Sequence, residues 1–434
     1  MHRKNVIIAL LLQFAILFSV AGCAPAPADE PLSGTATADQ PDEPAYASTE
    51  TDDSDGDASQ GGVGGKPVDT VFIANIADFS MELFKTSRTG ENNSLISPLS
   101  IMLALTMTAN GADNETFSQI ERLLGGGIPL TDLNEYLYSY ITELTRGNNV
   151  KFNIANSIWF CDNEDGLQID PWFVQKSTDY FNASVFSSDF DSKTLDEINN
   201  WVNSNTEGMI DRIIDDIDPD AMVYLINVIA FDADWKLAYT GNDVHEGIFT
   251  NINRNQQNVE FMHSMESKYL DDGNASGFIK PYINGRYSFA ALLPNEDISI
   301  EEYIATLTGA GLLEILNNAE NTDVYTALPK FSYEYGVQMN EVLIALGISD
   351  AFDAALADFS QMAKSDRGNI YISRVLHKTF ISVDELGTRA GAATEVEVAE
   401  GISEKTVLLN RPFIYAIVDN KFGLPLFVGT LMTV

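Results

Sequence analysis

The 434-residue chain is strongly acidic, with 63 Asp and Glu residues against 25 Lys and Arg residues and a formal net charge of −38 at pH 7. Nucleic acid is bound mainly through Lys and Arg on phosphates, so a nucleic-acid partner is not expected. The length allows one large core or a division into two or three domains.

The first residues have the pattern of an export signal. Residues 2–4, His-Arg-Lys, precede a mainly apolar run over residues 6–20 that holds no acidic side chain. Residues 20–23, Val-Ala-Gly-Cys, then resemble a bacterial lipobox, in which the cysteine is linked to lipid and becomes the new N-terminus. The alternative is an ordinary signal peptide with a chance cysteine. We expect residues 1–22 to be a lipoprotein signal peptide and Cys23 to anchor an exported protein on the cell envelope, extracellular or surface-facing.

Residues 23–67 have the composition of a disordered acidic tether. They are rich in Ala, Pro, Ser, Thr, Gly and acidic residues, and such a segment cannot bury enough surface to offset its conformational entropy. The run 61–66 is similar to a phosphate-binding loop, but no strand precedes it and Pro67 stands where Ser or Thr would bind magnesium. A glycine linker is the better interpretation, followed by one domain over residues 68–434. Its only cysteine, Cys161, is expected to be buried and inert.

Hydrophobic periodicity predicts helices first and strands later in this domain. Ser97 before Pro98 is typical of an N-cap followed by a first-turn proline, and predicts a helix to about Asn110. Further helices are expected at 73–84, 115–124, 132–145, 171–180, 300–306 and 336–346. Strands are expected at 221–231, 258–262, 276–281, 287–293, 324–331, 375–383, 406–409, 413–419 and 426–432. Because helices and strands do not alternate regularly, the predicted fold class is α+β.

The sequence lacks the motifs of a catalytic or metal centre. It has four histidines, and neither a Gly-x-Ser-x-Gly elbow nor a His-Glu-x-x-His motif occurs. The acidic run 211–220 lacks the ligand spacing of a calcium loop, so a solvated turn is the better interpretation. Spacing leaves open only a serine triad whose members meet in the folded chain. We expect no cofactor, no metal and no enzymatic activity, which points to binding or inhibition.

Residues 384–406, DELGTRAGAATEVEVAEGISEKT and hereafter the loop segment, combine small side chains with the alternation of a strand. Between Thr388 and Val398 the even-numbered residues are Thr, Ala or Val, whereas the odd-numbered ones include Arg and Glu. A strand has a side-chain period of two, so this one could bury its even-numbered side and leave the other in water. Small residues after the Gly387 pivot would let it enter between two existing strands. A surface loop followed by an edge strand is the alternative.

Motifs along the whole domain resemble those of the serpins, a family of serine protease inhibitors. The matching stretches are NSLISPLSI (93–101), NNWVN (199–203) with Thr206 and Gly208, LINVIAF (225–231) before Trp235, LPKF (328–331), LHK (376–378), NRPF (410–413) and PLFVG (425–429). The resemblance implies a serpin fold with three β-sheets, about nine helices and an exposed reactive-centre loop formed by the loop segment.

The resemblance also implies a suicide-substrate mechanism. A serine protease would cleave the loop segment and form an acyl-enzyme, and insertion of the cut loop into the central sheet would trap the protease covalently. The hinge pattern of inhibitory members is matched by Glu385, Gly387, Thr388, Ala390, Ala392 and Thr394. Non-inhibitory members commonly lose this pattern; the alternative is a non-inhibitory serpin acting as a binding protein or plain substrate. We expect a monomer that touches the membrane through its lipid anchor only.

Counting without insertions, from Gly387 and from the NRPF motif, places the reactive bond at Gly401-Ile402. Glycine is a poor specificity residue, so neighbouring bonds stay open, and we expect an elastase-like or subtilisin-like target. The alternatives are Ala399-Glu400 for an elastase-like enzyme, Glu400-Gly401 for a glutamate-specific one and Lys405-Thr406 for a trypsin-like one.

Five further residues are assigned by the resemblance to places where the central sheet opens. His377 is similar to the histidine of the family's shutter, where it would hydrogen-bond Asn227 near Ser97 and Ser100. Trp235 resembles a tryptophan near the top of that sheet, where the loop first enters. All five are expected to be structural and to control insertion rather than to catalyse a reaction.

Overall fold

The computed structural model describes residues 64–145, 150–162, 166–366, 368–388 and 404–434. The helices of these parts are α1 (Thr70–Ser87), α2 (Pro98–Ala109), α3 (Asn114–Gly125), α4 (Leu130–Thr145), α5 (Pro171–Phe181), α6 (Ser192–Asn205), α7 (Ile300–Thr306), α8 (Gly309–Asn317) and α9 (Asn340–Ala345). The predicted Ser97 cap is present at the start of α2, with Pro98 in the first turn. Within the described ranges, no helix is both long and apolar enough to cross a membrane.

The strands form three larger sheets and one small pair. The large sheet has the order β12 (Phe331–Gln338), β14 (Ile372–Val383), β15 (Gly387–Thr388), β5 (Val223–Asp234), β2 (Lys151–Cys161) and β4 (Ser184–Ser188). The second six-stranded sheet has the order β1 (Ser94–Ile96), β18 (Leu424–Leu431), β17 (Phe413–Asp419), β10 (Tyr287–Pro294), β9 (Ala275–Pro281) and β8 (Tyr269–Asp271). The four-stranded sheet has the order β16 (Lys405–Leu408), β11 (Val324–Pro329), β7 (Gln256–Glu266) and β6 (Val244–Thr250). The small pair is β13 (Ala363–Ser365) with β3 (Leu167–Ile169). The predicted α+β class is confirmed, with three principal sheets.

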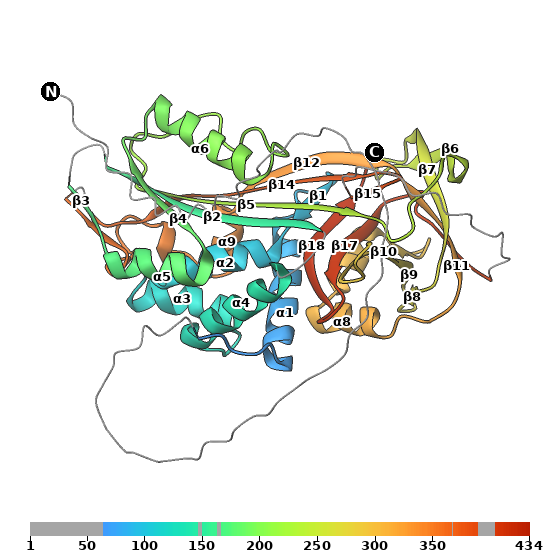
Figure 1. Ribbon diagram of the computed structural model, residues 1–434, viewed down its shortest axis with the longest axis horizontal. Helices are drawn as coiled ribbons and strands as arrows, with labels where there is room; N and C mark the ends of the chain where they lie inside the picture. The colour runs from blue at the N-terminus through green and yellow to red at the C-terminus, as the bar shows by residue number, and fades with distance from the viewer. Residues whose placement is uncertain (1–63, 146–149, 163–165, 367, 389–403) are drawn as a thin grey trace, which may run out of the picture. The chain divides into compact units, whose positions relative to one another are not determined.

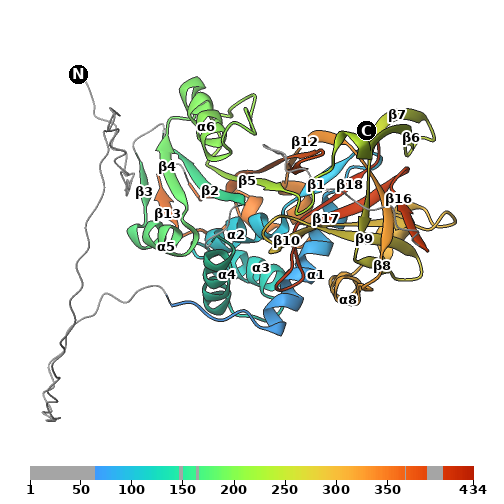
Figure 2. The ribbon, with the colours of Figure 1, turned by 45° about the vertical axis from the view of Figure 1, so that its right-hand side comes forward.

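Helices cover both faces of the large sheet. Figure 1 shows α6 on one side of the sheet and α2 to α5 on the other, and the turned view in Figure 2 keeps the same two layers apart. The side chains of β5 divide accordingly: Ile226 and Val228 pack with α6, whereas Leu225 and Ile229 join the main core. Because β5 is buried on both faces, residues 223–231 are apolar except for Asn227 and do not alternate.

Two predicted elements are wrong in extent. Residues 324–331 do not form one strand, because β11 ends at Pro329, the chain passes from one sheet to another at Lys330, and β12 starts at Phe331. The predicted helix 336–346 starts too early, because its first three residues complete β12, where Gly336 pairs with Lys378 of β14. Pairing with a neighbouring strand here outweighs the local helical periodicity.

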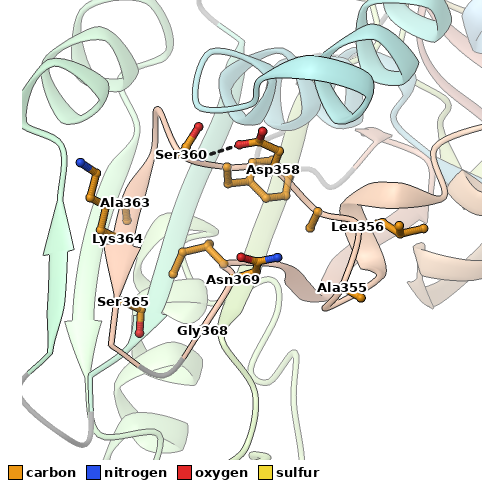
Figure 3. Close-up of a pocket in the computed structure, with 12 residues that line it drawn as sticks. Ala355, Leu356, Asp358, Ser360, Ala363, Lys364, Ser365, Gly368 and Asn369 are labelled. Atoms are coloured by element: carbon orange, nitrogen blue, oxygen red, sulfur yellow. Dashed lines mark hydrogen bonds between the residues drawn. The ribbon is translucent and has the colours of Figure 1, made fainter.

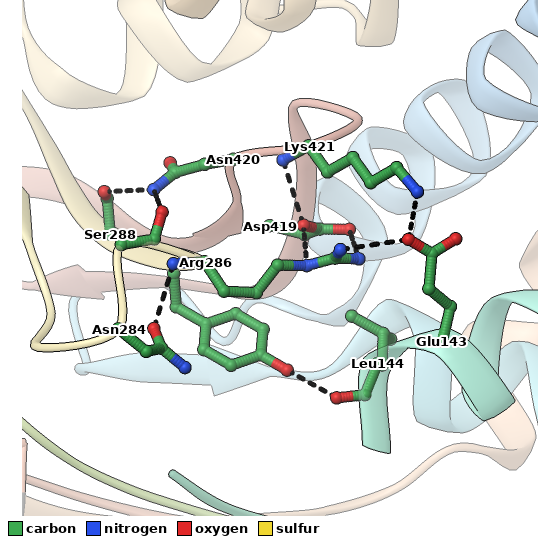
Figure 4. Close-up of polar contacts among 10 residues, drawn as sticks. Glu143, Leu144, Asn284, Arg286, Ser288, Asp419, Asn420 and Lys421 are labelled. Carbon is green, nitrogen blue, oxygen red and sulfur yellow. Dashed lines mark hydrogen bonds and ion pairs between the residues drawn. The ribbon is translucent and has the colours of Figure 1, made fainter. Parts of the chain in front are cut away.

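An ionic cluster ties α4 to the end of β17. Arg286 Nη2 donates to Asp419 Oδ2 at 2.9 Å and Nη1 donates to Glu143 Oε1 at 3.1 Å, and Lys421 also pairs with Glu143, as Figure 4 shows. Burial raises the pKa of the Asp419 carboxyl, against the opposing effect of Arg286. A buried carboxylate that lost such a partner would be strongly destabilising, so this cluster fixes the second sheet against α4.

Candidate functional site

The start of the loop segment enters the large sheet as β15. Gly387 and Thr388 lie between β14 and β5 and run antiparallel to both, with Thr388 opposite Val383 on one side and Ala233 on the other. Beyond β15 the two flanking strands pair directly with each other in parallel, with 372–378 of β14 beside β5. The sheet therefore contains a two-residue wedge, Gly387 and Thr388. It lies toward one end of the line along which β14 and β5 face each other, hereafter the seam.

Close backbone contact makes glycine necessary in the wedge. A Cβ atom at Gly387 would lie 2.1 Å from the carbonyl oxygen of Ala233, a distance that backbone atoms cannot accommodate without moving. The preceding Glu385 accepts a hydrogen bond from Lys330 Nζ at 2.7 Å. Burial acts to raise the pKa of the Glu385 carboxyl, but the hydrogen bond and charge of Lys330 outweigh burial and keep that pKa below its usual value. The hinge is thus held in the sheet by its backbone and by one ion pair.

Trp235 supports the wedge from the core side. Its ring stacks on Tyr282 with centroids 4.6 Å apart, and its Nε1 donates to the carbonyl oxygen of Asp384 at 2.9 Å. The Tyr282 hydroxyl in turn lies 2.6 Å from Thr388 Oγ1, and both side chains are buried. The structure therefore places Trp235 at the point where the loop segment enters the large sheet.

The four other residues of the predicted shutter meet near the end of the direct β14–β5 pairing that faces β15. Ser97 N donates to His377 Nε2 at 3.2 Å, and the two atoms His377 Nδ1 and Asn227 Oδ1 are 3.0 Å apart. Asn227 Nδ2 donates to the carbonyl oxygen of Ser100 at 3.0 Å, and Ser100 Oγ donates back to Asn227 Oδ1. Because Nε2 accepts a backbone N–H, the imidazole is neutral and Nδ1 carries the proton. Burial lowers the pKa of His377 to about 3.

These contacts join α2 to both strands of the seam. His377 of β14 and Asn227 of β5 are direct partners in the parallel ladder, while Ser97 and Ser100 belong to the start of α2. The two strands cannot separate at this point without breaking the hydrogen bond between the histidine and the asparagine. The geometry fits the predicted structural role of the cluster, and control of insertion stays a prediction.

A cavity of about 590 Å³ lies elsewhere, inside a fold of the chain between residues 355 and 370. Figure 3 shows the lining, with Ser360 donating its backbone N–H to Asp358. The described residues that line this cavity include no histidine, cysteine or tyrosine and none of the predicted site residues. The cavity therefore adds nothing to the candidate site.

Several predicted site residues lie outside the described parts of the chain. They are Cys23, Ala390, Ala392, Thr394, Ala399, Glu400, Gly401 and Ile402. The reactive bond, the rest of the hinge and the lipidation site therefore stay predictions. So do the boundaries of the signal peptide and the tether.

Comparison with known proteins decides the family. Residues 74–434 match the family model described as Serpin (serine protease inhibitor). This chain is a serpin. It is 29% identical to the leukocyte elastase inhibitor of Xenopus tropicalis, covering 81% of this chain and 96% of that protein, and 28% identical to neuroserpin of Homo sapiens, covering 82% and 90%.

Solved serpin structures share the fold. The thermophilic serpin tengpin in its native state is 54% identical and gives a TM-score of 0.83 over 86% of this chain and 97% of that chain. Tengpin in its latent state is 53% identical and gives a TM-score of 0.77 over 85% and 100%. By TM-score, this serpin is thus more similar to the native than to the latent structure of tengpin.

Three residues that contact the site were not predicted from the sequence. Lys330 belongs to the LPKF motif, but its ion pair with Glu385 depends on the two sheets meeting at that point. Tyr282 follows β9, forms an isolated bridge with Trp235 and belongs to no motif, although it contacts both Trp235 and the wedge. Asn156 Oδ1 accepts a hydrogen bond from Asn227 at 2.6 Å and extends the shutter to β2. Asn156 gave no distinct local signal, because β2 also contains Asn153 and Ser157.

Proposed function

We propose that this serpin inhibits serine proteases as a suicide substrate, by cleavage of the loop segment, its insertion into the large sheet and covalent trapping of the protease. The observation that carries the proposal is the wedge: β15 already lies antiparallel between two strands that, further along, pair directly with each other over residues 372–378 and 223–228. The family description and the leukocyte elastase inhibitor among the relatives support it. The catalytic serine belongs to the protease, so the serpin itself is not an enzyme.

The pairing of β15 sets the register for the rest of the loop segment. Extending both antiparallel ladders residue by residue puts Ala392 opposite Ile229, and puts Thr394 between Asn227 and His377. Directly opposed residues point to the same face of a sheet, and Ile229 faces the main core. The small even-numbered side chains would therefore be buried, with the Thr394 hydroxyl in the polar shutter.

The same register gives the odd-numbered side chains partners on the α6 face. It would put Glu397 opposite Arg374 of β14, and Glu395 between Arg374 and Lys378 on that strand. In the described structure, Arg374 instead pairs with Asp216 of the connection between α6 and β5, at 2.8 Å. On insertion, the acidic residues of the loop segment would form ion pairs with the basic side chains of β14 and replace Asp216 as the partner of Arg374.

The decisive test compares two neighbouring substitutions in an unlipidated Cys23→Ser chain. Ala392→Glu would bury an unpaired carboxylate in the main core during insertion, so this variant should be cleaved as a substrate without trapping the protease. Ala393→Glu is the matched control, because the register puts it beside Lys378, and it should still inhibit. The unsubstituted serpin should form a complex with an elastase-like or subtilisin-like protease that survives boiling in detergent.

The released C-terminal peptide should begin at Ile402 or a neighbouring residue when its mass is measured. Unchanged inhibition by Ala392→Glu would disprove insertion in this register. Clean cleavage of the parent protein, with the protease still active, would instead favour the non-inhibitory alternative.

We also propose that the serpin is exported and held on the outside of the cell by lipid on Cys23, as a monomer on an acidic tether. The support is the order of basic start, apolar run and small residues before that cysteine. Labelling with a radioactive fatty acid should mark the parent chain and not the Cys23→Ser variant. Equal labelling of both would contradict the proposal.

A further inference from the structure

Two of the four histidines of the chain lie together on β6, the edge strand of the four-stranded sheet, and its neighbour β7. The ring centroids of His245 on β6 and His263 on β7 are 5.2 Å apart. His245 is opposite Phe261 in the ladder, two residues from His263. Alternate residues of a strand share a face, so both rings project from the same side. Figure 1 shows β6 and β7 side by side toward the upper right of the ribbon, and the side chain of His245 is exposed while that of His263 is partly buried.

The spacing of the two rings fits a shared metal ion. Two imidazoles bound to one tetrahedral ion, each through a nitrogen about 2.1 Å from it, have centroids about 5 Å apart. His263 is also oriented by a neighbour, because its Nδ1 lies 2.8 Å from the hydroxyl oxygen of Tyr325 on β11. When Nδ1–H donates to that oxygen, the lone pair of Nε2 is left for a ligand. A hydrogen bond of this kind behind a metal-binding histidine is the usual way in which its ring is held.

The other metal-binding side chains of the described residues limit which ligands the ion could have. His377 has both ring nitrogens in hydrogen bonds and is buried. No group of three or more His, Cys, Asp or Glu side chains in the described residues could hold an ion. An ion at the pair would therefore have two protein ligands and complete its coordination with water. Imidazole ligands favour Zn²⁺, Ni²⁺ and above all Cu²⁺ over magnesium or calcium.

We propose that His245 and His263 form a binding site for a divalent transition-metal ion that bridges β6 and β7. The ion would tie these two strands together and, through Tyr325, reach β11. That strand pairs with β16, which begins with the last two residues of the loop segment. An ion that binds the folded form alone stabilises it by mass action, so the site would strengthen this sheet. The proposal does not depend on protease inhibition.

The test is equilibrium dialysis of the untagged Cys23→Ser chain against Zn²⁺, with the His245→Gln and His263→Gln variants alongside. His2 is present in all of them, so differences between variants report on the pair alone. The parent chain should bind one more Zn²⁺ than either variant, or bind it at least 10-fold more tightly. Tyr325→Phe should keep the stoichiometry and weaken binding by about 10-fold, because the ring loses its orienting hydrogen bond.

Electron paramagnetic resonance of bound Cu²⁺ gives a readout that a purely structural role would not change. The signal of the parent chain should show coupling to two imidazole nitrogens, and each single histidine variant should show one fewer. Circular dichroism without metal should be the same for all variants. Equal Zn²⁺ binding by the parent and the His245→Gln and His263→Gln variants, or a Cu²⁺ signal that these substitutions leave unchanged, would overturn the proposal.

Discussion

Acidification should destabilise the serpin through His377. Burial lowers the pKa of this side chain from 6.5 to about 3, so between these values the unfolded chain binds a proton that the folded chain excludes. The stability contributed by the neutral histidine is fully present above about pH 6.5 and is lost as the pH falls toward 3. One pKa unit corresponds to about 1.4 kcal/mol, so the expected loss of unfolding free energy is about 2 kcal/mol at pH 5 and about 5 kcal/mol for the whole shift.

The assay is urea unfolding of the parent protein and the His377→Gln variant at pH 7.5 and pH 5.0. All other ionisable groups are the same in the two proteins, so their contributions cancel when the two pH-dependent losses are subtracted. The variant should lose about 2 kcal/mol less than the parent between the two pH values, whatever its stability at pH 7.5. Equal losses in the two proteins would refute the buried neutral histidine.

Three further substitutions probe the wedge and the seam. Gly387→Ala should push the hinge away from the Ala233 carbonyl, so more inhibitor should be consumed per protease inhibited; an unchanged stoichiometry would contradict the tight contact. Thr388→Val should leave the buried Tyr282 hydroxyl unpaired and reduce the unfolding free energy by about 1–3 kcal/mol, whereas Thr388→Ser should not. Asp216→Asn should remove an ion pair to β14 and speed formation of the covalent complex; an equal rate would show that this contact does not resist opening.

Features set by neighbours along the chain could be predicted from the sequence. The Ser97 cap is a local arrangement, since its side chain bonds an N–H only three residues away. The strand 413–419 and the helix 300–306 were predicted with the bounds that the structure has. Both are short segments with a strong hydrophobic or capping pattern of their own. The alternation of side chains in the loop segment likewise predicts, from the sequence alone, which side of that strand would be buried.

Features set by distant pairing could not be predicted in this way. Gly336 belongs to a strand because β14 lies beside it, and the residues next to Gly336 in the sequence do not indicate this pairing. The contact between Asn227 and His377, 150 residues away, could be predicted only from the family resemblance, because periodicity gives no information on it. The pair of His245 and His263 depends on the register between two strands, and shifting that register by one residue would put the rings on opposite faces.

The direction of the strands explains why the loop segment would enter the sheet at all. The seam between β14 and β5 is a parallel pairing, whereas β15 is antiparallel to both. A fully inserted loop would replace one parallel ladder by two antiparallel ladders, which are slightly more stable per residue. At about 1 kcal/mol for each added hydrogen bond, a strand of about twelve residues would contribute on the order of 10 kcal/mol, as much as the whole stability of many domains. The uninserted form can then persist only behind a kinetic barrier, and the contacts that close the seam, above all that between His377 and Asn227, are the ones whose loss should lower it.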